Sequence, residues 1–173
     1  MLTFALESVE QCWPDVFALA TQHWASTTTY RRHEPFNPSF TRYRDYNQAG
    51  YFRLFTARDG ERLVGYFGIY LTASMHSQLP MATEDTLFLH PDYRGGRNAI
   101  RFIRFVEAHC RDWGVHEIIF SCEIDNETGI QGLLRMLDYR PVIVQFSKLI
   151  DTPCADSAPT SMESTHVGTL SPS

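Results

Sequence analysis

The chain has 173 residues, a length that fits one domain with a well-formed core. Its formal net charge of −5 argues against a general nucleic-acid-binding protein, and no apolar run is long enough to span a membrane. The N-terminus lacks a basic stretch followed by an apolar one, so we expect no signal peptide and a cytoplasmic protein. The four cysteines are widely spaced and form no ligand pattern with the histidines, which predicts reduced thiols and no metal site.

The chain opens with a predicted strand and a predicted helix. Residues 2–6 alternate weakly between apolar and polar, which favours a strand. Ser8 and Gln11 have the spacing of a capping box, so a helix is expected from there to about Trp24. Pro14 is unfavourable inside a helix, which indicates that its regular part begins at Pro14 itself.

Residues 25–50 form a polar, aromatic and arginine-rich stretch, interrupted by Pro35 and Pro38. Short helical turns joined by loops are expected here. Two interpretations carry equal weight: a solvated loop with a few anchoring aromatic residues, or a segment that helps to select a substrate.

A hairpin and a further strand follow. Residues 51–57 and 62–71 are rich in aromatic and β-branched residues, and the Asp59-Gly60 pair between them is a strong hairpin signal. Gly65 and Gly68 indicate a bulge or close packing in the second strand. A loop is expected over residues 72–81 and a strand over 83–89.

The most informative stretch is the turn that joins this strand to the next helix. Pro91 and the pair Gly95-Gly96 follow the apolar strand, and residues 100–114 have apolar residues at helical spacing. A glycine-rich turn that opens a helix gathers unpaired backbone N–H groups at the positive end of the helix dipole. Such a turn is suited to binding phosphate.

This stretch resembles the acetyl-coenzyme A signature of the GNAT (Gcn5-related N-acetyltransferase) superfamily. Leu89-His90-Pro91 matches the end of the family's fourth strand, and the segment from Arg94 to Ala99 matches its pyrophosphate loop. One position departs from the signature, because Arg97 stands where the loop usually has its central glycine. A cationic side chain at that position could contact a phosphate directly.

The C-terminal third is also similar to that family. A buried strand is expected over residues 117–123, then a helix from Asn126 to Leu137, and a last strand over 142–150. Asp138-Tyr139 stands where the family usually has Gly-Phe. Residues 151–173 are rich in Ser, Thr and Pro and predict a flexible tail. We therefore expect one GNAT-like domain over residues 1–150 and a tail over 151–173.

The resemblance implies an α/β fold with a mixed, mostly antiparallel central sheet, flanked by helices and splayed between its fourth and fifth strands. It also implies that acetyl-CoA is the cosubstrate. The residues that match the family's cofactor positions are Leu87, Phe88, Leu89, Arg94, Gly95, Gly96, Arg97, Asn98, Ala99 and Asn126.

The resemblance further implies a carboxylate base on the fourth strand, where Glu84 and Asp85 are both available. Strand alternation directs the two side chains to opposite faces, and we favour Glu84 for its longer reach. The family's usual acid, a tyrosine, is replaced by Leu134, so Tyr139 in the following turn is the remaining candidate. A thiol can also leave as thiolate and take its proton from water.

The resemblance therefore implies an N-acetyltransferase that transfers an acetyl group from acetyl-CoA directly to a primary amine of a small molecule or a protein. The alternative is a catalytically inactive GNAT-like module that binds CoA or a partner protein, which the missing tyrosine and Arg97 favour. No nucleic-acid or membrane partner is expected, and a homodimer stays open.

Overall fold

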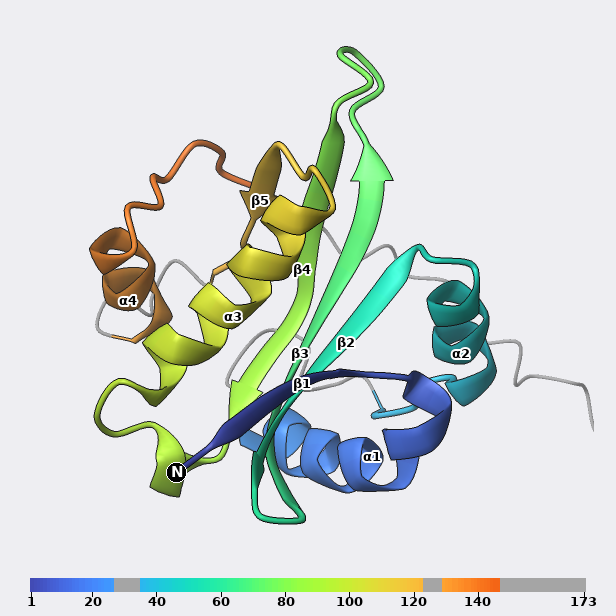
Figure 1. The fold of residues 1–173 in the computed structure, drawn as a ribbon, viewed down its shortest axis with the longest axis vertical. Coiled ribbons are helices and arrows are strands. Elements are labelled where there is room, and N and C mark those ends of the chain that lie inside the picture. The colour runs from blue at the N-terminus through green and yellow to red at the C-terminus, as the bar shows by residue number, and fades with distance from the viewer. Residues whose placement is uncertain (27–34, 123–128, 147–173) are drawn as a thin grey trace, which may run out of the picture. The chain divides into compact units, whose positions relative to one another are not determined.

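The computed structural model describes residues 1–26, 35–122 and 129–146, and it divides into two compact units, residues 1–140 and 141–173. All the helices and strands described here belong to the first unit (Figure 1). They are β1 (Thr3–Glu7), α1 (Val9–Ser26), α2 (Phe40–Gln48), β2 (Phe52–Asp59), β3 (Arg62–Ala73), β4 (Pro80–Leu89), a 3₁₀ helix (Pro91–Tyr93), α3 (Asn98–Asp112), β5 (Glu117–Ile119) and α4 (Ile130–Met136).

The five strands form one sheet in the order β1-β2-β3-β4-β5. The first four strands pair antiparallel with their neighbours, and β5 pairs parallel with β4. The β4–β5 pairing covers only Met81–Thr83 against Glu117–Ile119, after which the described residues of the two strands no longer pair. The predicted mixed, mostly antiparallel sheet that splays between its fourth and fifth strands is confirmed.

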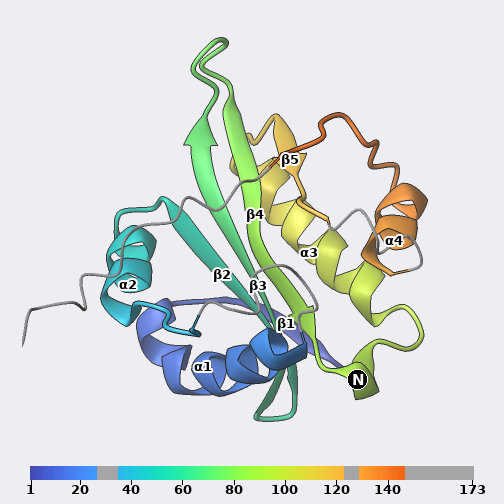
Figure 2. The same cartoon turned by 180° about the vertical axis from the view of Figure 1, so that it is seen from behind.

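Helices lie on both sides of the sheet (Figures 1 and 2), and each face has its own hydrophobic core. On one face α3 buries Phe102, Ile103 and Val106 against the sheet, and α4 adds Leu134. On the other face α1 buries Val9, Cys12, Val16 and Leu19, and Phe40 and Tyr43 of α2 pack at its border. Neighbouring strand residues such as Leu54 and Phe55 enter different cores, as the alternation of side chains requires.

The first helix begins earlier than Pro14 suggested. Ser8 Oγ accepts a hydrogen bond from the Gln11 N–H at 3.3 Å, and Asn47 Oδ1 of α2 accepts one from the Val9 N–H at 3.3 Å. These two acceptors satisfy N–H groups of the first turn, so the helix begins at Val9 and includes Pro14.

Three other boundaries differ from the predictions. The loop predicted over residues 72–81 is shorter, because the β3–β4 ladder continues to the pair Ala73–Pro80; proline is tolerated as the first residue of a strand. The strand predicted over 117–123 ends at Ile119, where its pairing with β4 ends. Residues 142–146, predicted as part of a last strand over 142–150, are not in a strand. The rest of that strand and the predicted domain boundary at Ile150 lie outside the described residues.

Candidate active site

The site is built around the stretch beyond Thr83 and Ile119 where the described residues of β4 and β5 no longer pair, here called the gap. The His90 N–H, just after β4, donates to the Val64 carbonyl of β3 at 2.8 Å. Because N–H groups along a strand alternate in direction, those of Leu87 and Leu89 point away from β3 and into the gap. The N–H of Phe88 points toward β3, and its side chain is buried in the core beneath α1. Of the three predicted β4 positions, Leu87 and Leu89 therefore offer backbone donors to a ligand.

The predicted phosphate loop lies between the 3₁₀ helix and α3. Gly96 has φ +66°, and a Cβ placed at either Gly95 or Gly96 would meet nothing within 4 Å. Arg97 occupies the N-cap position of α3 without making a side-chain cap. The first N–H groups of α3 are thus left without a side-chain acceptor, at an exposed turn that a phosphate can approach closely.

The loop is anchored to the end of β4 by Arg94. Its Nε donates to the Leu89 carbonyl at 2.8 Å, and its guanidinium lies 5.4 Å from the centre of the Phe88 ring. Asn98 Nδ2 donates to the Tyr93 carbonyl at 3.1 Å, which ties the start of α3 to the 3₁₀ helix. Arg97 is exposed, and Ala99 is half-buried in the first turn of α3. Asn126, the remaining predicted cofactor residue, lies outside the described residues.

A β-bulge lies at the paired carboxylates. The register between β3 and β4 shifts from Gly68–Thr86 to Ile69–Glu84, so Asp85 is an extra residue in β4. Asp85 and Thr86 consequently reach the same face, Asp85 toward α2 and Thr86 toward His23 of α1. Gly68 makes room for this arrangement, since a Cβ there would lie 2.7 Å from the Phe52 ring and 3.4 Å from Asp85 Oδ2.

Glu84 lies on the other side of the bulge, toward β5. Its Oε2 accepts a hydrogen bond from the Ser121 N–H at 3.3 Å, and the backbone of Leu87 donates to the same carboxylate. Burial raises the pKa of Glu84 to about 7, although these two backbone bonds favour the charged form. A carboxyl with a pKa near neutrality is suited to accept a proton from an amine.

Asp85 is held by tyrosines on the α2 side. The Tyr43 hydroxyl of α2 donates to Asp85 Oδ2 at 3.1 Å, and Tyr70 of β3 also donates to this carboxylate. Burial raises the pKa of Asp85, and the two tyrosine bonds oppose the rise. The prediction that Glu84 and Asp85 leave β4 on opposite faces therefore agrees with their contacts.

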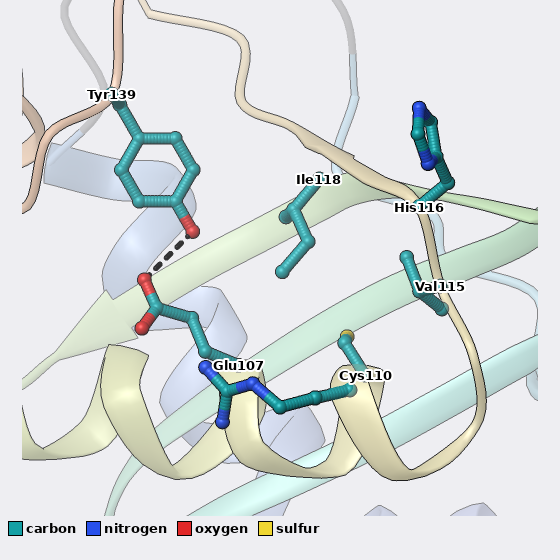
Figure 3. A pocket seen from close by; sticks show the side chains of 7 residues that line it. Glu107, Cys110, Val115, His116, Ile118 and Tyr139 are labelled. Carbon is teal, nitrogen blue, oxygen red and sulfur yellow. Dashed lines mark hydrogen bonds between the residues drawn. The ribbon is translucent and has the colours of Figure 1, made fainter.

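Tyr139, the predicted acid, lies away from the two carboxylates, beside α3. Its hydroxyl donates to Glu107 Oε1 of α3 at 2.9 Å, and both side chains border a hollow of about 280 Å³ (Figure 3). The other residues that line the hollow are Cys110, Arg111, Val115, His116 and Ile118. None of these described lining residues belongs to β4, so the structure does not bring Tyr139 together with Glu84 and Asp85.

Sequence reasoning did not single out Tyr43 and Tyr70, which contact Asp85, or Ser121, which contacts Glu84. Tyr43 stands in the aromatic stretch of residues 25–50, which gave the only hint of a role at the site. Tyr70 and Ser121 carry no motif, and only the strand register brings them close to β4.

In residues 1–26, 35–122 and 129–146, no three His, Cys, Asp or Glu side chains are grouped as metal ligands. No helix in that part of the chain is both long and apolar enough to cross a membrane.

A mixed sheet that opens between β4 and β5, with a glycine turn leading into α3 at the end of β4, is the arrangement of a GNAT-type fold. Residues 14–137 match the acetyltransferase (GNAT) family. This match covers well over half of the sequence, so the chain belongs to that family.

Solved structures share the fold at low sequence identity. An aminoglycoside acetyltransferase from an uncultured soil metagenomic sample is 14% identical with a TM-score of 0.73, covering 87% of this chain and 99% of its own. The aminoglycoside acetyltransferase AAC(6')-Iy was solved with the bisubstrate analogue CoA-S-monomethyl-acetylneamine. It is 15% identical with a TM-score of 0.68, and the match covers 87% of this chain and 99% of its own.

A ribosomal-protein-alanine N-acetyltransferase from Brucella melitensis is 16% identical with a TM-score of 0.62, covering 85% of this chain and 100% of its own. A comparison with curated protein sequences finds no match. The relatives of known structure therefore support the fold of this chain and leave its substrate open.

Proposed function

We propose that this protein is an acetyl-CoA-dependent N-acetyltransferase that transfers the acetyl group directly to a primary amine. One observation carries the proposal: the gap between β4 and β5, into which the Leu87 and Leu89 N–H groups point, leads to the open glycine loop at the start of α3. A CoA molecule fits this combination, because its pantetheine arm carries amides for the strand donors and its pyrophosphate suits the loop.

The acceptor is expected to be an amine of a small molecule or of a protein. The structural neighbours include acetyltransferases of both kinds, named for aminoglycosides and for a ribosomal-protein alanine. Since their identity to this chain is at most 16% in these examples, they support amine acetylation without selecting one acceptor.

In the proposed reaction the amine nitrogen attacks the thioester carbonyl, a C–N bond forms, and the C–S bond breaks. Glu84 is the candidate base that takes the amine proton, with Asp85 as the alternative on the α2 face. An N–H in the gap, with Leu89 at the matching family position, would stabilise the oxygen of the tetrahedral intermediate. Tyr139 remains the side-chain candidate for the acid; otherwise the CoA thiolate takes its proton from water.

A catalytically inactive CoA-binding module is the second candidate. It is favoured by one observation: Leu134 fills the position of the usual acid and is buried in the α3-side core, while Tyr139 hydrogen-bonds to Glu107 in the hollow beside α3.

A thiol-release assay with acetyl-CoA over a panel of primary amines, run beside calorimetric titration with CoA, tests both candidates. The enzyme is expected to bind CoA and to release thiol only when an acceptor amine is present. Binding of CoA without turnover on any small amine or peptide N-terminus would favour the inactive module. Absence of CoA binding would contradict both.

A further inference from the structure

Glu84 makes a contact across the gap that a general base does not need. Its carboxylate starts on β4 one residue after the last β4–β5 pair, Thr83–Ile119, and reaches the Ser121 N–H two residues beyond Ile119. The side chain therefore bridges the two strands where their backbones no longer pair. It is partly buried in this position.

In the free protein the Glu84 side chain supplies acceptors to backbone N–H groups of both strands. Where the ladder ends, backbone N–H groups on both strands lose the acceptor that a neighbouring strand would give them; the Leu87 N–H belongs to a half-buried residue and the Ser121 N–H to an exposed one. The Glu84 carboxylate accepts from one donor on each side, Leu87 on β4 and Ser121 beyond β5. A single charged side chain thus supplies the acceptors that a continuous ladder would otherwise provide.

A ligand that entered the gap would meet the same two donors. The Leu87 N–H points into the gap, and the Ser121 N–H points back toward β4 because it donates to Glu84. Asp85 does not take the place of Glu84 there, since its side chain leaves β4 on the opposite face, where it accepts from Tyr43. A ligand and Glu84 therefore compete for one set of backbone groups.

We infer that the Glu84 carboxylate closes the β4–β5 gap in the free protein and must leave the Leu87 and Ser121 N–H groups when CoA enters. This inference rests on the proposed function, because it assumes that CoA binds in the gap. It assigns Glu84 a role in cofactor affinity: each hydrogen bond to the carboxylate opposes binding. Entry of the cofactor also frees the carboxylate beside the thioester, at the moment when a base is needed.

Calorimetric titration with CoA tests the inference, because CoA carries no acetyl group and allows no turnover. Glu84→Ala removes the competing acceptor and is expected to bind CoA about tenfold more tightly than the wild type, the size of one charged hydrogen bond. Glu84→Gln keeps a weaker, neutral acceptor and is expected to lie between the two.

The matched control is Glu117→Gln, which removes an exposed carboxylate from β5, the strand across the gap. It reports how much any lost negative charge favours the anionic CoA, and its affinity is expected to stay within about twofold of the wild type. Tightening that is equal in Glu117→Gln and Glu84→Ala would overturn the inference, as would unchanged or weaker binding by Glu84→Ala.

Amide hydrogen exchange without ligand gives a second measurement that does not depend on binding. The Ser121 amide is expected to exchange faster in Glu84→Gln than in the wild type and in Glu117→Gln, because the neutral side chain is a weaker acceptor. Equal exchange in all three proteins would overturn the inference. If none of the proteins bound CoA, the inference and the proposed function would both fall; if CoA bound without tightening, only the inference would.

Discussion

The Tyr43 hydroxyl donates to Asp85 Oδ2 at 3.1 Å and so joins α2 to β4 at the bulge. The ring of Tyr43 packs against Trp13 of α1 and Phe52 of β2, which fixes the hydroxyl in place. One side chain therefore positions the helix and the carboxylate relative to each other. A substitution that keeps the ring and removes the hydroxyl can separate the hydrogen bond from the packing.

Tyr43→Phe is expected to lower the free energy of unfolding by about 1 kcal/mol, the net value of one hydrogen bond of a partly buried group. The bond from Tyr43 lowers the pKa of Asp85, so its loss is expected to raise that pKa further. Urea unfolding measures the first effect, and NMR titration of the Asp85 carboxyl carbon measures the second.

Tyr46→Phe on the same helix is the control for Tyr43→Phe. Its ring stays available to pack against Tyr70, and its side chain is more exposed than that of Tyr43. A loss of stability in Tyr46→Phe as large as in Tyr43→Phe would show that the Tyr43–Asp85 bond contributes nothing of its own.

The glycine loop gives a second prediction. Gly96→Val is expected to weaken CoA binding at least tenfold, because a branched side chain would block the approach of a phosphate to the backbone. The substitution also forces a β-branched residue into φ +66°, which costs about 1–2 kcal/mol of stability. Titration with CoA and thermal unfolding measure the two effects.

Gly60→Val separates these two effects. Gly60 has φ +61° and open space around it, as Gly96 has, but it lies in the β2–β3 hairpin. It is expected to lose similar stability and to keep its CoA affinity. Equal CoA affinity for folded Gly96→Val and the wild type would show that this loop does not hold the phosphates.

The sequence predicted the elements whose signals are local. The Asp59-Gly60 turn, the Ser8 cap and the apolar spacing of α3 depend on neighbouring residues, and each appears where it was expected. Gly68 indicated a bulge or close packing, and the structure has both at this residue.

The sequence could not predict the contacts that depend on register between distant segments. Tyr43 reaches Asp85 across 42 positions of sequence, and Ser121 reaches Glu84 across 37. The face of Thr86 also depends on register: the bulge places Thr86 on the face of Asp85, whereas an unbulged strand would place it on the face of Glu84. The early end of β5 at Ile119 also has no local signal, since its apolar residues continue to Cys122.

The raised pKa of Glu84 predicts how stability depends on pH. The pKa is about 7 in the folded protein against 4.5 for the free group, so the folded state holds more protons between these values. Stability contributed by Glu84 is therefore present at low pH and is lost as pH rises toward 7. The full loss is at most about 3 kcal/mol.

Glu84→Gln removes this titration. Relative to the wild type, its free energy of unfolding is expected to increase between pH 5 and pH 8, and urea unfolding at both values measures the change. Glu117→Gln, at the exposed start of β5, serves as the reference for loss of a carboxylate. A difference between Glu84→Gln and the wild type that stayed constant with pH would contradict the raised pKa.

The last prediction concerns the base. Glu84→Gln and Asp85→Asn are expected to affect kcat unequally, because the two carboxylates leave β4 on opposite faces and only one can reach an amine held over the thioester. We expect Glu84→Gln to lower kcat by about a hundredfold to ten-thousandfold, the usual contribution of a positioned base. Its CoA affinity is expected to lie between those of the wild type and Glu84→Ala.

Asp85→Asn keeps an acceptor for the Tyr43 hydroxyl and is expected to stay near the wild-type kcat. Steady-state kinetics with saturating acetyl-CoA and one accepted amine separate the two variants, and circular dichroism checks that both are folded. A large loss confined to Asp85→Asn would move the base to the α2 face. Small and equal losses would exclude a carboxylate base, because neither side chain would then be needed to take the proton. The amine would in that case be deprotonated by water or by a residue of segment 25–50, the other part of the chain that the sequence connects with the acceptor.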